Sequence, residues 1–317
     1  MSQPNCQILN WNVRGLNDGA RRDVVHDLVR DTCSTIICLQ ETKLAAIDRG
    51  VVARTLGNKF LNNFTFLPAE KTRGGILLAA SEDYFSLSNI TLTRYKITAK
   101  ITMKADNTQW WITVVYEPQT DVDKLLFLQE LKDLADPDLD EWLVLGDFNL
   151  IYQAEDKNNT NLNRHLMGSF KATIDALRLK ELRLNGRRFT WSNGQDNPTL
   201  TRIDRVFCTP DWGILFQSCY LHSLPSLMSD HTPLLLQGQL DRETNNFFRF
   251  ENFWVHMDGF KEAVQTTWNR PVTSTQPLKR RQIKMACTAK SLKKWKKNLK
   301  LVTPSSNWLW SKKSSFV

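Results

Sequence analysis

The 317-residue sequence lacks a long apolar run, a paired-cysteine motif and an internal repeat. No apolar segment approaches the roughly 20 residues that a membrane-spanning helix needs, and Met1 to Gln7 are too polar for a secretion signal. The six cysteines include no two at a C-x-x-C spacing, so we expect buried free thiols rather than disulfides or a zinc site. A soluble, intracellular protein without membrane association is therefore expected.

Acidic residues are scarce in the C-terminal quarter of the chain. Residues 1–240 carry 26 Lys and Arg against 28 Asp and Glu, a net charge of −2, whereas residues 241–317 carry 16 against 5, a net charge of +11. Between Lys279 and Lys313 there are 12 basic residues and no acidic one. We expect a nearly neutral globular domain over residues 1–240 and a separate basic segment over residues 241–317.

Strand-like and helix-like segments mix along residues 1–240 without strict alternation. Apolar runs predict strands at 7–13, 35–39, 74–79, 95–103, 109–116, 142–145, 188–191, 202–208 and 234–240, and helical periodicity predicts helices at 20–30, 122–135 and 166–179. This mixture favours a layered α/β or α+β sandwich over a Rossmann sheet or a barrel.

The basic segment has a different pattern. Residues 247–254 are aromatic and are expected to pack on the globular domain, and residues 279–301 favour a helix. Four apolar residues of the basic segment recur every seven positions: Leu278, Met285, Leu292 and Leu299. One apolar residue per heptad is a weak seam for a partner helix. Two interpretations of the basic segment stay open. It could contact phosphates with salt-sensitive affinity, or it could be a solvated end of the chain.

Polar residues stand where the predicted strands end. The run at 142–145 is followed by Gly146, Asp147, Phe148 and Asn149, and in an extended backbone Asp147 and Asn149 point the same way. A carboxylate beside a carboxamide can align a water molecule and hold a phosphate oxygen. Alone, the pattern is more typical of an Asx turn.

Further strand ends carry residues of the same kind, namely Asn12, Glu41, Tyr116, Asp204 and the pair Asp230 and His231. Each has an ordinary explanation when it is considered singly. Glu41 could be a solvated acid, and Asp204 could pair with a neighbouring arginine. His231 could be a capping or core histidine. Their occurrence together predicts a site, because α/β sheets bind ligands at strand ends.

Six segments, in this order, resemble the endonuclease/exonuclease/phosphatase superfamily. They are Trp11-Asn12-Val13, Gln40-Glu41-Thr42-Lys43, Tyr116-Glu117-Pro118, Gly146-Asp147-Phe148-Asn149, Arg202-Ile203-Asp204 and Ser229-Asp230-His231. Residues 10–17, 189–193 and 202–205 are most similar to the apurinic-endonuclease-like domain of plant LINE-type (non-LTR) retrotransposons. The resemblance covers about residues 5–240. Such elements continue into a reverse transcriptase. The resemblance therefore implies that this sequence is a truncated retroelement product.

The resemblance implies a four-layered α-β-β-α sandwich of two mixed β-sheets with flanking helices. It also implies a phosphodiesterase that depends on Mg2+, with Mn2+ as a substitute. In such an enzyme Glu41 would be the main metal ligand and Asp230 would support the metal, since oxygen ligands suit hard cations.

Roles for the remaining positions also come from the resemblance. Asp147 would orient or activate the attacking water, and Asn12, Asn149 and Tyr116 would hold the water or the phosphate. Asp204 would orient His231 and keep it charged, so that the imidazolium stabilises a non-bridging oxygen. Four side chains would contact DNA: Arg14, Lys43, Trp191 and Arg202. The connection at 192–201 resembles a hairpin that such nucleases press into DNA, although an ordinary surface turn explains it equally well.

Two departures from the family pattern stand out. Arg14 replaces an acidic residue of the repair enzymes, which argues against dedicated abasic-site repair, and Glu117 stands where plant elements usually have glycine.

The predicted function is Mg2+-dependent DNA nicking that leaves a 3′-hydroxyl and a 5′-phosphate. DNA is the expected partner, no obligate protein partner is evident, and the nucleus is the expected location. A phosphatase of the same fold and an inactive nucleic-acid-binding remnant are the alternatives.

Overall fold

The computed structural model describes residues 6–70, 74–117, 120–134, 140–226, 228–239, 255 and 257–272, and the positions from 280 to 295 except 282, 286, 289 and 293. The chain divides into two compact units, Met1–Arg242 and Glu243–Val317, which we describe separately. No helix within the described ranges is long and apolar enough to cross a bilayer.

The first unit contains a seven-stranded mixed sheet with the strand order β10-β14-β15-β1-β2-β4-β3. Its strands are β1 (Cys6–Asn12), β2 (Ile36–Gln40), β3 (Phe64–Leu67), β4 (Ile76–Ala80), β10 (Leu184–Asn185), β14 (Ser218–Ser223) and β15 (Leu234–Gln239). Strand β1 runs parallel to β2 and antiparallel to β15. The C-terminal end of β1 therefore lies beside the start of β15.

A second, six-stranded mixed sheet has the order β5-β6-β7-β8-β13-β9. It comprises β5 (Phe85–Leu92), β6 (Lys96–Met103), β7 (Gln109–Tyr116), β8 (Trp142–Asp147), β9 (Lys180–Glu181) and β13 (Asp204–Cys208). Strand β8 is parallel to β7 and antiparallel to β13. A separate hairpin pairs β11 (Trp191–Ser192) with β12 (Leu200–Thr201).

Side-chain alternation along the strands divides the core into layers. In β8, Leu143 and Leu145 face the core between the two sheets, whereas Trp142 and Val144 face the opposite side. Both faces of the strand are buried, which explains why its sequence is continuously apolar.

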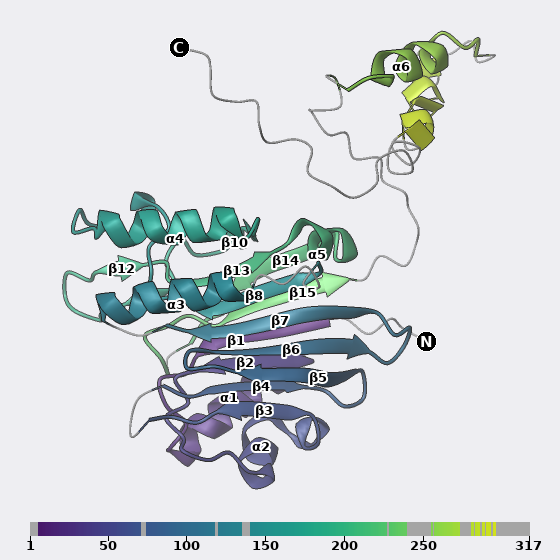
Figure 1. The fold of residues 1–317 in the computed structure, drawn as a ribbon. Helices are drawn as coiled ribbons and strands as arrows, with labels where there is room; N and C mark the ends of the chain where they lie inside the picture. The colour runs from purple at the N-terminus through teal and green to yellow at the C-terminus, as the bar shows by residue number, and fades with distance from the viewer. Residues whose placement is uncertain are drawn as a thin grey trace. The chain divides into compact units, whose positions relative to one another are not determined.

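Helices cover the outer faces of the two sheets (Figure 1). They are α1 (Gly19–Asp31) and α2 (Arg49–Leu56) on the seven-stranded sheet, and α3 (Asp121–Asp133) and α4 (Arg164–Ala176) on the six-stranded one. The short helices α5 (Pro210–Leu215), η1 (Asn58–Phe60) and η2 (Ala154–Asp156) lie in connections. The predicted four-layered sandwich is confirmed.

Several segments differ from the sequence prediction. Of the expected strand at 188–191, only Trp191 lies in a strand, the two-residue β11, and β13 begins at Asp204 rather than Arg202. Short elements such as α2, β3 and β14 were not predicted. Strand β5 is exposed from Ser88 onward, so it lacks the apolar signal on which strand prediction depends.

The second unit contains α6 (Phe260–Trp268). The described positions between 280 and 295 are helical, as the sequence predicts. The Trp295 indole N–H donates to the Asp258 carbonyl oxygen at 3.3 Å, and its ring lies edge-on to Phe260. Leu292 is buried but Met285 is 61% exposed, so the heptad residues do not form one continuous buried stripe. Leu278, Leu299 and the aromatic stretch at 247–254 lie outside the described residues.

Candidate active site

The ends of strands from both sheets meet at one edge of the sandwich. The seven-stranded sheet supplies Asn12 at the end of β1 and His231 just before β15. The six-stranded sheet supplies Asp147 at the end of β8 and Asp204 at the start of β13, and these two residues are paired across the antiparallel ladder. Because directly paired residues have neighbouring side chains, the ladder register places two carboxylates side by side.

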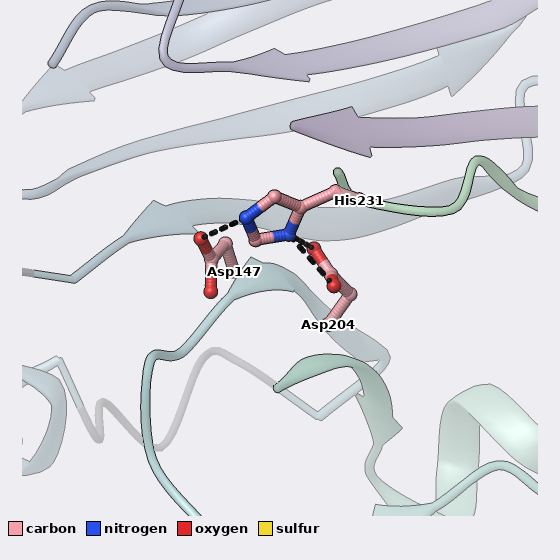
Figure 2. Close-up of side chains that lie close together, drawn as sticks. All are labelled: Asp147, Asp204 and His231. Atoms are coloured by element: carbon pink, nitrogen blue, oxygen red, sulfur yellow. Dashed lines mark hydrogen bonds and ion pairs between the residues drawn. The ribbon is translucent and has the colours of Figure 1, made fainter. Parts of the chain in front are cut away.

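His231 lies between the two carboxylates (Figure 2). Its Nδ1 is 3.1 and 3.0 Å from the two carboxylate oxygens of Asp204, and its Nε2 is 3.8 Å from Oδ2 of Asp147. All three side chains are buried. Although burial by itself lowers the pKa of His231, the charges of Asp204 and Asp147 raise it to about 9. The imidazole is therefore cationic at neutral pH.

Asp147 is held by amide donors on both of its oxygens. Asn12 Nδ2 donates to Oδ2 at 2.8 Å, and the Asn149 backbone N–H donates to Oδ1 at 3.0 Å. Burial raises the pKa of Asp147 to about 6. The carboxylate is thus ionised at pH 7, yet close enough to neutrality to accept a proton.

The end of β8 and the turn that follows it depend on a glycine, the penultimate residue of the strand. Gly146 has φ 143°, and a Cβ at this position would collide with the Val115 carbonyl oxygen of the neighbouring strand β7. Asn149 also has a positive φ, 43°, and its Nδ2 donates to the Glu117 carbonyl oxygen at 3.1 Å. This turn folds Asn149 back towards Asp147, so that it supports the same carboxylate as Asn12.

Two hydroxyl residues without a predicted role, Thr190 and Ser229, hold the cluster in place. Thr190 Oγ1 accepts the backbone N–H groups of Ile203 and Asp204, each at 3.1 Å. Ser229 Oγ donates to the Asn12 carbonyl oxygen at 2.8 Å and accepts the His231 N–H at 3.1 Å. Both lie inside the segments that carry the family resemblance, and only that proximity could have pointed to them.

Glu41 lies outside this buried cluster, at the exit of β2. Its backbone has φ 54° and Lys43 has φ 56°, a conformation that costs energy in residues other than glycine. The backbone N–H groups of Thr42 and Lys43 donate to the carbonyl oxygens of Gly75 and Gly74, at 3.1 and 3.0 Å. These bonds fix the loop, and Lys43 Nζ lies 3.0 Å from Glu41 Oε1.

Asp230 has partners that the sequence did not indicate. The Trp191 indole N–H donates to Oδ2 at 2.9 Å, and the Arg14 guanidinium forms an ion pair with the same oxygen. Arg14 itself has φ 50°, and its backbone N–H donates to Asn12 Oδ1 at 3.1 Å. Three predicted residues, Arg14, Trp191 and Asp230, therefore form one rim contact beside His231.

Arg202 faces a different group of residues. Its guanidinium lies 2.8 Å from Glu181 Oε1, and the same oxygen also binds the fully buried Arg205, which pairs with Asp156. Burial lowers the pKa of Arg202. The side chain is only 18% exposed, so the predicted DNA contact would require it to leave Glu181.

Among the described residues, one cluster and one separate carboxylate have the chemistry to hold a divalent cation. One oxygen or nitrogen each from Asp147, Asp204 and His231 lie within 4.8 Å of one another. Asp204 already holds His231 through Nδ1, and His231 is cationic, which disfavours a metal among them. The carboxylate of Glu41 is 17% exposed and has a single cationic side-chain partner, Lys43, among the described residues. Its hard oxygen donors fit Mg2+ or Mn2+, so Glu41 is the better candidate.

Residues 9–231 match the Endonuclease/Exonuclease/phosphatase family, and the chain belongs to this family. Its members are hydrolases of the nuclease and phosphatase type, which typically depend on divalent metals. A search of curated proteins finds no match to this sequence.

Solved structures share the fold of the first unit at low sequence identity. One is AP endonuclease LMAP from Leishmania major, with 14% identity and a TM-score of 0.58 over 74% of this chain and 88% of that one. Another is the endonuclease domain of TRAS1, a telomere-specific non-LTR retrotransposon, with 14% identity and a TM-score of 0.52 over 75% and 100% of the two chains. D. rerio TDP2, complexed with single strand DNA product, has 14% identity and a TM-score of 0.50 over 75% and 100%.

Proposed function

We propose that the protein is a Mg2+-dependent endonuclease of the retrotransposon type that nicks DNA and leaves a 3′-hydroxyl and a 5′-phosphate. The observation that carries the proposal is the buried cluster in which His231 lies between Asp147 and Asp204. It combines a fixed cation with a carboxylate of raised pKa, which is the pair of groups that phosphodiester hydrolysis needs.

Each buried residue has a distinct task in this reaction. Asp147 accepts a proton from the attacking water, and the amides of Asn12 and Asn149 keep its carboxylate in one orientation. His231 Nε2 is 3.8 Å from Asp147, which is longer than a hydrogen bond. Its proton is therefore directed to a non-bridging phosphate oxygen. Asp204 holds the ring and its charge through Nδ1.

Glu41 is the proposed ligand of the divalent cation. When bound, Mg2+ would supply Lewis-acid stabilisation of the leaving oxygen. Lys43 shields the Glu41 carboxylate in the structure described here, and it would be freed to contact a phosphate when the cation takes its place. Tyr116, which is paired with Asp147 across the β7–β8 ladder, is the proposed hydroxyl partner of the phosphate.

Three features support DNA as the substrate. The rim of the site carries Arg14 and Trp191, whose contacts with Asp230 hold them beside His231. The β11–β12 hairpin projects from this rim with an exposed tip at 194–197. AP endonuclease LMAP, the TRAS1 endonuclease domain and TDP2 share the fold. The charge of the basic segment would add salt-sensitive affinity, and a DNA substrate makes the nucleus the proposed location.

The test is conversion of supercoiled plasmid to nicked circles with Mg2+, with EDTA as the control. The nicks should serve directly as primers for a DNA polymerase, since the proposed product has a 3′-hydroxyl. Release of phosphate from inositol polyphosphates is measured in parallel. Phosphate release without nicking would replace the endonuclease with a phosphatase, and DNA binding without either reaction would identify an inactive remnant.

A further inference from the structure

The second unit contains a pair of antiparallel helices, which are α6 and the helix at the described positions between 280 and 295. Three contacts join them: Trp295 with Phe260, Ser291 with Ala263, and Lys284 with Trp268. Residue numbers rise along α6 while they fall along its partner, so the two helices form a hairpin. None of the tasks assigned to the nuclease site uses this hairpin.

The charge of the hairpin has one sign beyond its first turn. Glu262, in the first turn of α6, is the last acidic residue of the sequence. Residues 263–317 contain 13 Lys and Arg and no Asp or Glu. Five of these basic residues are described and exposed, namely Arg270, Arg280, Arg281, Lys290 and Lys294. A surface without acidic neighbours to neutralise it attracts a polyanion.

Several basic side chains gather around an exposed tryptophan where α6 ends. Trp268 is the last residue of α6 and is 40% exposed, and Lys284 Nζ lies 5.7 Å from the centroid of its ring. Arg280 and Arg281 precede Lys284 by four and three positions, so each is a neighbour of Lys284 on the helix surface. These four residues form the Trp268 patch, an aromatic ring beside three cations.

An anionic membrane is one class of polyanion that basic helices bind, but it does not fit this hairpin. Binding to a membrane surface requires a continuous apolar face on the helix. Leu292 is buried. Ile283 and Met285 are exposed, but they stand two positions apart and therefore point to different sides of the helix. The described residues thus provide no exposed apolar stripe that could enter a membrane.

A single strand of nucleic acid matches the patch better. Proteins bind single strands by stacking bases on aromatic rings while basic side chains follow the phosphates. In a duplex the faces of the bases are stacked on one another, so they cannot reach the indole ring of Trp268. Charge alone would attract a duplex as well as a single strand, and the exposed tryptophan therefore distinguishes the two ligands.

We propose that the Trp268 patch is a binding site for single-stranded nucleic acid. One base stacks on the indole ring, and the phosphates beside it are bound by the three basic side chains. This site lies in the second unit and goes beyond the proposed nuclease function. Its test needs no cleavage, so either proposal can fail without the other.

The first experiment measures fluorescence anisotropy of labelled probes with the full chain in EDTA, where no metal supports cleavage. The probes are a short oligo(dT), a short oligo(U) and a DNA duplex of the same length. Trp268→Ala should weaken binding of the single strands about tenfold, the loss expected for one stacked base, and leave the duplex unchanged. Tyr84→Ala removes an aromatic side chain of the first unit with similar exposure, 41%, and should change neither affinity.

A second variant separates stacking from folding of the hairpin. Trp268→Phe keeps an aromatic ring and should retain most of the affinity for single strands, whereas Trp268→Ala should not. Circular dichroism of both variants checks that the helices remain. A loss of single-strand affinity in Trp268→Phe as large as in Trp268→Ala would count against stacking.

The salt dependence tests the basic part of the patch. Arg281→Met should reduce the slope of log affinity against log salt for oligo(dT) by about 0.7, as expected for one lost phosphate contact on a single strand. Lys261→Met removes an exposed lysine near the start of α6 and should leave the slope unchanged. An equal change in both variants would mean that only the total charge matters.

The outcomes separate the possible ligands. Tighter binding of oligo(U) than of oligo(dT) would identify RNA as the natural strand, and the reverse would identify DNA. Equal losses for duplex and single strands in Trp268→Ala, or no loss at all, would overturn the inference. Sedimentation with phosphatidylserine vesicles that is lost in Trp268→Ala, while oligonucleotide binding is kept, would replace the nucleic acid with a membrane surface.

Discussion

The buried cluster and the rim of the site use charge in different ways. In the cluster, Asp147, Asp204 and His231 are buried, and they are held by one another and by neighbouring amide and hydroxyl groups. At the rim, Glu41 and Asp230 each pair with a partly exposed basic side chain, Lys43 at 27% and Arg14 at 52% exposure. Exposed ion pairs are weak, so the rim can exchange partners whereas the cluster cannot.

This difference suggests a division of labour. The cluster is preorganised, which is what electrostatic stabilisation of a transition state requires. In the proposed reaction, each rim pair would occupy its acid until a metal ion or a phosphate replaces one partner. Mutations in the cluster should therefore change the rate of the chemical step, and mutations at the rim should change binding.

A large effect is expected for Asp147→Ala. Removing the carboxylate that receives the proton should lower kcat for nicking about 1,000-fold, with KM nearly unchanged. Quench-flow or gel measurements of plasmid nicking give both constants. Asp211→Ala, which removes an exposed carboxylate of α5, is the control and should nick like wild type. A loss confined to KM would mean that Asp147 binds substrate rather than acting in the chemical step.

A smaller loss, about 100-fold, is expected for Asp204→Asn, which keeps the shape of the side chain but removes its charge. In the proposed mechanism nicking needs ionised Asp147 and protonated His231, so the rate of wild type should form a bell between pH 6 and 9. In Asp204→Asn the alkaline limb of the pH profile should move to lower pH, because His231 loses the carboxylate that most strongly stabilises its cationic form. NMR titration of His231 checks this directly, and an unmoved limb would contradict it.

The same pKa shift should appear in the stability of the protein. The folded-state pKa of His231, about 9, lies above the ordinary value of 6.5. Its contribution to the free energy of unfolding is therefore fully present below pH 6.5 and is lost as the pH rises through 9. Urea denaturation should show wild type losing stability over this range. The Asp204→Asn variant should lose less stability over the same pH range. A loss equal to that of wild type would argue against the ion pair between Asp204 and His231.

At the rim, the two members of one pair should have opposite effects. Glu41→Gln should lower nicking about tenfold at fixed Mg2+ because it removes the proposed ligand charge. Lys43→Met should instead raise metal affinity a few-fold, since it frees the carboxylate. Electron paramagnetic resonance titration with Mn2+ measures both affinities without catalysis. If Lys43→Met weakens Mn2+ binding, the pairing in this structure does not compete with the metal.

The smallest effect is expected for Arg14→Ala. It should raise KM a few-fold, leave kcat unchanged and reduce the salt dependence of DNA binding by about one unit of slope, as expected for one lost phosphate contact. Binding isotherms at several salt concentrations measure the slope. An unchanged slope of binding affinity against salt concentration would show that Arg14 pairs with Asp230 and does not contact DNA.

The sequence predicted the layered fold and the clustering at strand ends because both follow from local patterns. Apolar runs such as Leu143 to Leu145 predict buried strands, and polar residues after them mark one edge of the sandwich. The register that pairs Asp204 with Asp147 was not predicted, since it depends on contacts between segments 57 positions apart.

The ion pairs could not be predicted in the same way. Lys43 pairs with Glu41 in a loop where both residues have a positive φ, and Arg14 reaches Asp230 across 216 positions. Arg202 turns to Glu181 on β9, a two-residue strand without a sequence signal. Long, flexible side chains choose partners according to tertiary geometry, which a local pattern does not contain. The burial of the Glu117 carboxyl group likewise depends on tertiary contacts, so the sequence did not predict it.

In the proposed mechanism, the histidine between the two aspartates stabilises the charge that develops on the phosphate. The most direct test compares Mg2+-dependent plasmid nicking by wild type, His231→Ala and His222→Ala, the last of which removes a half-buried histidine of β14. Wild type and His222→Ala should nick at similar rates, and His231→Ala should show no nicking above background while it keeps its near-ultraviolet circular dichroism. Nicking by folded His231→Ala at the wild-type rate would contradict the account.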